Sequence, residues 1–124
     1  KKPCLIALHH CPMSGCISPG CQLKNAQAFL DVIYKHENVK AVISGHTHCA
    51  KESSQSGIQF LTTPSTFLHA SHPQEGGSEY AEDMMKSHSF SRDMRGYRVI
   101  DLFSNGDLMS EVCWVPIESK THNQ

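Results

Sequence analysis

Four histidines, His9, His10, His46 and His48, stand in two short clusters, and each cluster directly follows an apolar run. Neutral imidazole is the commonest metal-binding side chain. In an extended segment His46 and His48 face the same way, about 6.6 Å apart along the chain. One imidazole pair at that spacing can hold two metal ions lying about 3.5–4 Å apart. The pattern predicts a metal centre with His9, His46 and His48 as ligands. His10 is expected beside it, behind the ligands or facing the substrate.

The six cysteines offer a second kind of site. Four residues separate Cys11 from Cys16 and Cys16 from Cys21, whereas paired zinc thiolates typically have two residues between them. We therefore expect mostly free thiols, and a structural zinc domain that adds Cys49 remains an alternative. Cys11 and Cys49 each follow a histidine, but adjacent residues of an extended chain point to opposite faces, which disfavours a thiolate nucleophile.

Composition limits the partners of the chain. The 124 residues carry a net charge of −1, so no broad positive field favours nucleic acid or an anionic membrane. No apolar run approaches the roughly 20 residues of a membrane span, and the first apolar stretch is too short for a signal peptide. The sequence predicts a soluble, cytoplasmic domain.

The elements that position the first histidines form a predicted strand–helix–strand unit. Residues 4–8 are a continuous apolar run typical of a buried strand, and residues 39–44 are predicted to be a second buried strand. Residues 23–36 have apolar side chains at helical spacing. Strands in such a unit are neighbours and parallel. Ligand sites in α/β sheets gather at the carboxyl ends of strands. Gly45 is expected to let the chain turn sharply there.

The second part of the chain is predicted to be antiparallel. Residues 50–54 and 57–62 are expected to form a hairpin that turns at Ser56-Gly57, and residues 97–103 and 108–115 a second one that turns at Asn105-Gly106. Residues 65–95 have no firm period. The fold class is therefore mixed α/β, with a strand–helix–strand unit followed by antiparallel hairpins.

Two motifs, Leu8-His9-His10-Cys11-Pro12 and Gly45-His46-Thr47-His48, resemble the C-terminal half of a calcineurin-like metallophosphoesterase. Residues 22–26, the Thr62-Thr63-Pro64-Ser65-Thr66 segment and Gly96-Tyr97-Arg98 extend the likeness to the bacterial 3′,5′-cyclic AMP phosphodiesterase branch. The likeness covers about residues 3–115. It implies that residues 1–115 are the C-terminal half of an αββα sandwich domain. Residues 116–124 are polar and are predicted to be a tail.

The resemblance also implies a role for each matching residue. His9 and His46 match ligands of one metal ion, and His48 matches a ligand of the other. The two ions are commonly drawn from iron, manganese and zinc, and they activate water to attack a phosphodiester. The implied reaction converts a cyclic nucleotide, cyclic AMP, to its 5′-monophosphate. Candidate substrate contacts are Asn25, His10, Thr63 and Ser65.

The family's Asp-x-His, Gly-Asp-x-x-Asp and Gly-Asn-His motifs, which lie upstream in the family, are missing from this sequence. We therefore expect weak metal binding and no useful turnover by the chain alone. We also expect an exposed sheet face that associates with the N-terminal half of the domain or with a second copy. A non-catalytic metal- or partner-binding module that keeps the fold is the alternative function.

Overall fold

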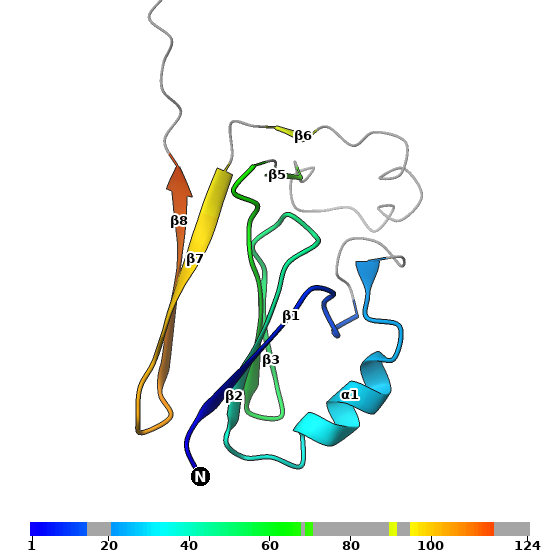
Figure 1. The fold of residues 1–124 in the computed structure, drawn as a ribbon, viewed down its shortest axis with the longest axis vertical. Helices are drawn as coiled ribbons and strands as arrows, with labels where there is room; N and C mark the ends of the chain where they lie inside the picture. The colour runs from blue at the N-terminus through cyan, green and yellow to red at the C-terminus, as the bar shows by residue number, and fades with distance from the viewer. Residues whose placement is uncertain (15–20, 68, 71–89, 92–94, 116–124) are drawn as a thin grey trace, which may run out of the picture.

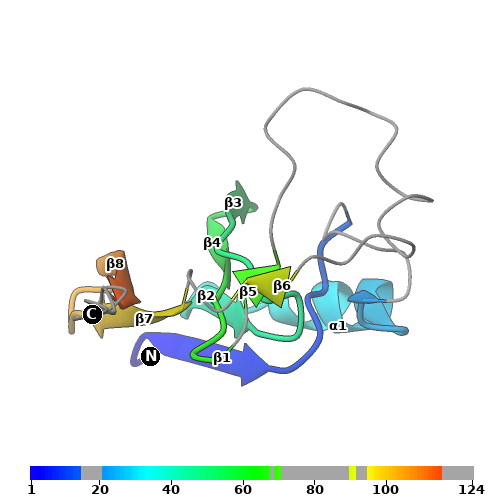
Figure 2. The same cartoon turned by 90° about the horizontal axis from the view of Figure 1, so that it is seen from above.

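The computed structural model describes residues 1–14, 21–67, 69–70, 90–91 and 95–115. The described residues form three layers, with a four-stranded sheet in the middle (Figures 1 and 2). Helix α1 lies on one side of this sheet, and a two-stranded hairpin, β7–β8, lies on the other. The predicted mixed α/β fold is confirmed.

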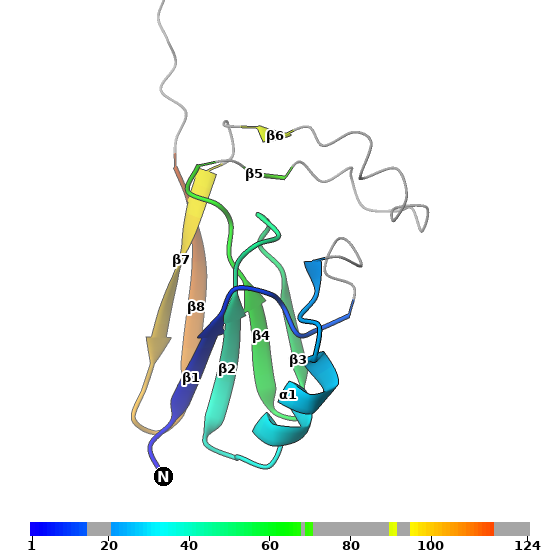
Figure 3. The same cartoon turned by 45° about the vertical axis from the view of Figure 1, so that its right-hand side comes forward.

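The central sheet contains β1 (Cys4–Leu8), β2 (Val39–Ser44), β3 (Glu52–Gln55) and β4 (Ile58–Thr62) in the order β1-β2-β4-β3 (Figure 3). Strands β1, β2 and β4 are parallel, and β3 is antiparallel to β4. The last residues of the parallel strands are in register, Leu8 with Ser44 and Ser44 with Thr62. Their carboxyl ends therefore meet at one edge of the sheet.

Helix α1 (Ala26–Ile33) is shorter than the predicted helix over residues 23–36. At its start, the Leu23 amide donates to the Cys11 carbonyl at 2.9 Å and so pairs outside the helix. At its end, the amides of Lys35 and His36 donate to carbonyls three residues earlier rather than four. The last predicted turn is therefore a tighter, 3₁₀-like one.

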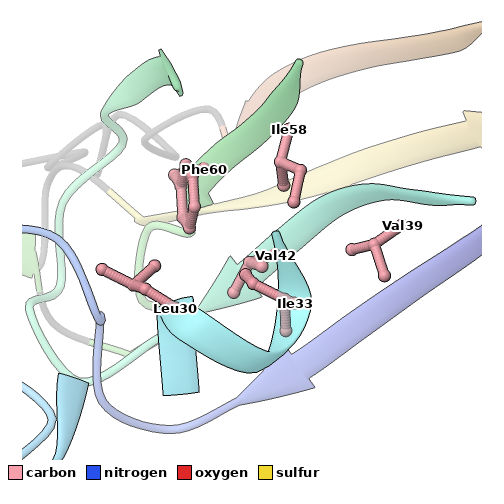
Figure 4. Close-up of a cluster of buried hydrophobic side chains, with 6 residues drawn as sticks. All are labelled: Leu30, Ile33, Val39, Val42, Ile58 and Phe60. Atoms are coloured by element: carbon pink, nitrogen blue, oxygen red, sulfur yellow. The ribbon is translucent and has the colours of Figure 1, made fainter. Parts of the chain in front are cut away.

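The apolar face of α1 packs on the central sheet (Figure 4). The buried cluster comprises Leu30 and Ile33 of the helix and Val39, Val42, Ile58 and Phe60 of the strands. Tyr34 packs against its edge, and its hydroxyl is buried with no hydrogen-bond partner among the described residues. Burial raises the pKa of this hydroxyl.

The two predicted hairpins are confirmed, with one change in a turn. Ser56 and Gly57 join β3 to β4 with φ values of 53° and 77°, as a two-residue turn of type I′ requires. The second hairpin joins β7 (Arg95–Leu102) to β8 (Leu108–Val115). The Phe103 amide donates to the Asp107 carbonyl at 2.9 Å, so the loop between them has three residues, 104–106, rather than the two predicted. Gly106 closes this loop at φ 93°.

The predicted irregular stretch contains two short strands, β5 (His69–Ala70) and β6 (Phe90–Ser91), which pair antiparallel. Residues 71–89 between them and the predicted tail at 116–124 lie outside the described residues.

Arg98 of β7 joins the hairpin to the central sheet. Its side chain is 1% exposed, and its Nε and Nη2 donate to the Thr62 carbonyl at 3.2 and 3.0 Å. Its Nη1 donates to the Glu52 carboxylate and to the Ser110 hydroxyl. One guanidinium therefore links β4 and β3 with both strands of the hairpin.

Gly96 provides a second close contact between these layers. Its amide donates to the Ser65 carbonyl at 3.0 Å, just beyond β4. A Cβ at this position would lie 2.8 Å from Trp114 Cε3 and 2.9 Å from the Cys113 carbonyl oxygen. The approach of the hairpin therefore requires a residue without a side chain here.

The sequence predicted an exposed sheet face. The central sheet has α1 on one side and β7–β8 on the other. Most of the large exposed apolar residues belong to the β7–β8 hairpin and its loop: Tyr97, Val99, Phe103, Met109, Trp114 and Val115. Association through this surface stays a prediction.

Candidate metal centre

His9 and His46 meet where β1 and β2 end. His9 Nε2 lies 3.0 Å from His46 Nδ1, and the ring centroids are 4.9 Å apart. The Gly45 amide donates to the His9 carbonyl at 3.2 Å, so the pairing of the two strands continues one step beyond the sheet. This backbone contact places two residues that are 37 positions apart next to each other.

A tight turn presents His46. The Thr47 amide donates to the Gly45 carbonyl at 2.7 Å, and His46 between them has φ 63°. A three-residue γ-turn with positive φ is rare and strained. The expectation that Gly45 provides the turn is wrong, because its φ is not positive and a Cβ would meet only Thr63 Oγ1, at 3.9 Å. The left-handed residue is the histidine itself.

His48 also has a positive φ, 51°. The segment from His46 to His48 is therefore not extended, and the predicted same-face spacing of about 6.6 Å does not describe it. His48 lies outside the group of ligand atoms that converge at His9. Its charge nevertheless contributes to lowering the pKa of His46, which places it nearby.

Buried hydroxyl groups hold the loop that carries these histidines. The Thr62 hydroxyl donates to the Cys49 carbonyl at 2.7 Å and accepts from the Lys51 amide at 2.8 Å. The Cys49 thiol donates to the Thr47 hydroxyl at 3.3 Å. Thr47, Cys49 and Thr62 are all buried. The end of β4 thus fixes the loop that follows β2.

His10 joins the same cluster. Its ring centroid lies 4.3 Å from that of His46 and 5.0 Å from that of His9. One possible ligand atom from each of the three rings lies within 4.8 Å of the others. The sequence predicted His10 near the site but gave no sign of this convergence, because alternation along a strand does not apply after β1 ends.

The environment favours neutral imidazole at His46. Burial lowers its pKa, and the charges of His10, His9 and His48 lower it further, in that order. A neutral ring keeps a lone pair for a metal ion. The environment of His46 therefore favours the protonation state that metal binding needs.

The spacing of His9 and His46 fits a shared metal ion. Nitrogen ligands lie about 2.0–2.1 Å from such an ion. Two of them on one ion are therefore separated by about 2.8–3.4 Å, for angles between square and tetrahedral. The observed 3.0 Å between His9 Nε2 and His46 Nδ1 is within this range.

The predicted substrate residues lie around the same edge of the sheet or at α1. The Thr63 hydroxyl and amide both donate to the Ser44 carbonyl, at 3.3 and 2.9 Å, so Thr63 extends β4 beside Gly45. The Ser65 hydroxyl accepts from the Phe67 amide at 3.1 Å. Asn25 is exposed just before α1, with no side-chain cap bond. Their contact with substrate remains a prediction.

The cysteines do not form the alternative zinc site within the described part of the chain. The group of converging ligands found there contains three histidines and no cysteine. The described cysteines, Cys4, Cys11, Cys21, Cys49 and Cys113, form no disulfide with one another. Cys16, which the alternative also needs, lies outside the described residues.

Comparison with known proteins confirms the resemblance. Residues 1–50 match the sequence pattern of the calcineurin-like phosphoesterase family. A probable cyclic nucleotide phosphodiesterase from Psychrobacter arcticus is 33% identical over 116 residues, which cover 92% of this chain and 37% of that protein. The 3′,5′-cyclic adenosine monophosphate phosphodiesterase CpdA from Vibrio vulnificus is 28% identical, over 90% of this chain and 38% of that protein.

A solved structure is also similar. A dimetal phosphatase from Danio rerio superposes with a TM-score of 0.47 at 21% identity, and the match covers 92% of this chain and 32% of the phosphatase chain.

The chain spans about 40% of the length of the first curated relatives that it matches. None of the helices in the described ranges is long and apolar enough to cross a membrane.

Proposed function

We propose that this chain supplies the C-terminal part of the metal centre of a phosphodiester hydrolase that acts on cyclic nucleotides and opens cyclic AMP to 5′-AMP. The observation that carries the proposal is the 3.0 Å approach of His9 Nε2 to His46 Nδ1 at the ends of two parallel strands. The similarity to proteins named cyclic nucleotide phosphodiesterases supports the substrate class.

The roles of the histidines follow the resemblance and the geometry together. His9 and His46 hold one metal ion, and His48 binds the other. When bound, the ions polarise the phosphoryl oxygen and lower the pKa of water, so that a nucleophile forms near neutral pH. The protein's part is positional, because the turn at Gly45–Thr47 and the Thr62 hydroxyl hold His46 facing His9 before any ligand arrives.

The substrate contacts that we propose lie on the segment after β4 and before α1. Thr63 stands beside the turn that presents His46. Ser65, two residues further along, accepts the backbone bond from Gly96 and is thereby tied to the hairpin. Together with Asn25, these residues supply uncharged hydrogen-bonding groups for a phosphodiester and its sugar.

We propose that the chain alone is inactive and works with the upstream part of the same domain. The site has imidazole ligands, and the described cluster contains no carboxylate to bridge two ions. The relatives are also more than twice as long as the matched region. The exposed apolar residues of β7–β8 are the surface we expect to associate.

We place the reaction in the cytoplasm, in keeping with described cysteines that form no disulfide with one another.

The test compares the chain alone with the chain co-expressed with the upstream part of the domain. Hydrolysis of cyclic AMP and of bis-p-nitrophenyl phosphate is measured with added Mn²⁺. We expect activity only in the co-expressed sample, and we expect His46→Gly to abolish it. Glycine suits this control, because it accepts the positive φ of position 46 while removing the ligand.

A matched variant tests whether the effect is specific to the cluster. His36 is exposed next to α1 and lies outside the converging group, so His36→Gln should leave the rate unchanged. Robust metal-dependent turnover by the isolated chain would contradict the proposed dependence on the upstream part. A folded, metal-loaded complex that hydrolyses neither substrate would favour the non-catalytic module.

A further inference from the structure

The two ring nitrogens of His10 have different environments. His10 Nδ1 lies 3.3 Å from the Cys21 carbonyl oxygen. A carbonyl oxygen only accepts hydrogen bonds, so Nδ1 must carry the proton and donate it. In the neutral ring this leaves the lone pair on Nε2.

The Cys21 carbonyl is positioned by contacts that do not involve the histidines. Cys11 and Gln22 form an isolated parallel bridge, and the Leu23 amide donates to the Cys11 carbonyl at 2.9 Å. Gln22 Nε2 donates to the Pro12 carbonyl at 3.3 Å. Cys11 and Pro12 are buried. The acceptor for His10 is therefore held by the fold of the loop after β1.

We propose that His10 is itself a metal ligand, through Nε2, and completes a three-imidazole site with His9 and His46. The inference rests on the proposed function, which places an ion between His9 and His46. One candidate ligand atom from each of the three rings lies within 4.8 Å of the other two, and the His10 ring centroid lies 4.3 Å from that of His46. A backbone carbonyl behind a ligating histidine is the usual way in which the tautomer and orientation of such a ligand are fixed.

The donor set also indicates which ions the cluster takes. Three imidazole nitrogens, with no carboxylate among the converging described groups, suit transition metals such as zinc, cobalt or nickel. Magnesium and calcium prefer oxygen ligands. We therefore expect this cluster to bind Co²⁺ and Zn²⁺ and to leave Mg²⁺ in solution.

The test counts the bound imidazoles directly. The chain is labelled with ¹⁵N-histidine and loaded with Co²⁺, which shifts the ring resonances of each ligand strongly by its paramagnetism. We expect shifted ring N–H resonances from His9, His10 and His46, with Nδ1–H retained on His10. His10→Gln should remove one set, keep the other two and weaken Co²⁺ binding at least 10-fold, since loss of a group behind a ligand already costs 10–100-fold.

The outcomes separate this inference from the function on which it rests. His36→Gln is the matched control, and all three shifted sets and the Co²⁺ affinity should survive it. If His10→Gln leaves the Co²⁺ affinity unchanged while His9 and His46 still shift, His10 is not a ligand and the inference is overturned, although the proposed function stands. If none of the three shifts, both are overturned.

Discussion

Replacement of Arg98 by methionine should strongly destabilise the fold. The guanidinium is 1% exposed and makes two bonds to the Thr62 carbonyl. A hydrogen bond to a charged group contributes about 1.5–3 kcal/mol, and a buried carbonyl that loses its donor costs about 1–3 kcal/mol more. Because both bonds share one acceptor, these values do not simply add. We expect Arg98→Met to lower the free energy of unfolding by about 3 kcal/mol.

The ion pair itself should matter far less. Glu52 is 58% exposed on its side chain, and exposed ion pairs contribute about 0.2–1 kcal/mol. Glu52→Gln removes the charge but keeps an acceptor for Arg98. We therefore expect this variant to cost under about 1 kcal/mol, several-fold less than the change at its partner.

Urea unfolding followed by two signals tests this reasoning. Trp114 is the single tryptophan of the chain and lies on β8, so its fluorescence reports on the hairpin, whereas far-UV circular dichroism reports on all the elements. In the wild type the two transitions should coincide, as in two-state unfolding. In Arg98→Met the fluorescence transition should come first. An equal loss for Glu52→Gln and Arg98→Met would refute the argument that the carbonyl bonds dominate.

Three further outcomes are expected. Gly96→Ala should destabilise the protein by about 1–3 kcal/mol in the same urea experiment, because its Cβ would overlap Trp114 and the Cys113 carbonyl oxygen; an unchanged midpoint would contradict the close approach. Tyr34→Phe should stabilise by about 1 kcal/mol, since it removes a buried hydroxyl that lacks a partner among the described residues; a loss of stability would show that the hydroxyl is bonded. Co²⁺ at 100 times its dissociation constant should stabilise the wild type by about 2.7 kcal/mol but not His46→Gly, measured by thermal unfolding before and after addition of EDTA; equal stabilisation of both would place the ion elsewhere.

The strands and hairpins could be predicted because their signals are local. Residues 4–8 are apolar throughout and residues 39–44 are apolar apart from Lys40 and Ser44, and this pattern is typical of parallel strands. Ser56-Gly57 supplied the positive φ values that a two-residue hairpin demands. The predicted helix is too long at its end because its pattern continues to residue 36, whereas the amides of Lys35 and His36 donate to carbonyls three residues earlier rather than four.

The details of the site depend on contacts between distant residues and were not predictable in the same way. Strand ends brought His9 to His46, as parallel pairing requires. The convergence of His10 depends on a bend after Leu8 and on the carbonyl of Cys21, eleven residues further along. The link through Arg98 joins residues 36 positions apart. The residues quoted in the resemblance included Gly96 and Arg98, but their spacing carried no sign of these contacts.

The left-handed backbone at position 46 restricts how this centre can change by single substitutions. Apart from glycine, the residue types that adopt positive φ most readily are asparagine, aspartate and histidine. Asparagine and aspartate bring oxygen donors, which favour harder ions such as magnesium, calcium and manganese. Any replacement of His46 that keeps the Gly45–Thr47 turn therefore either deletes a donor or exchanges nitrogen for oxygen. The residue type at position 46 therefore determines both the geometry of the turn and the ion preference of the site.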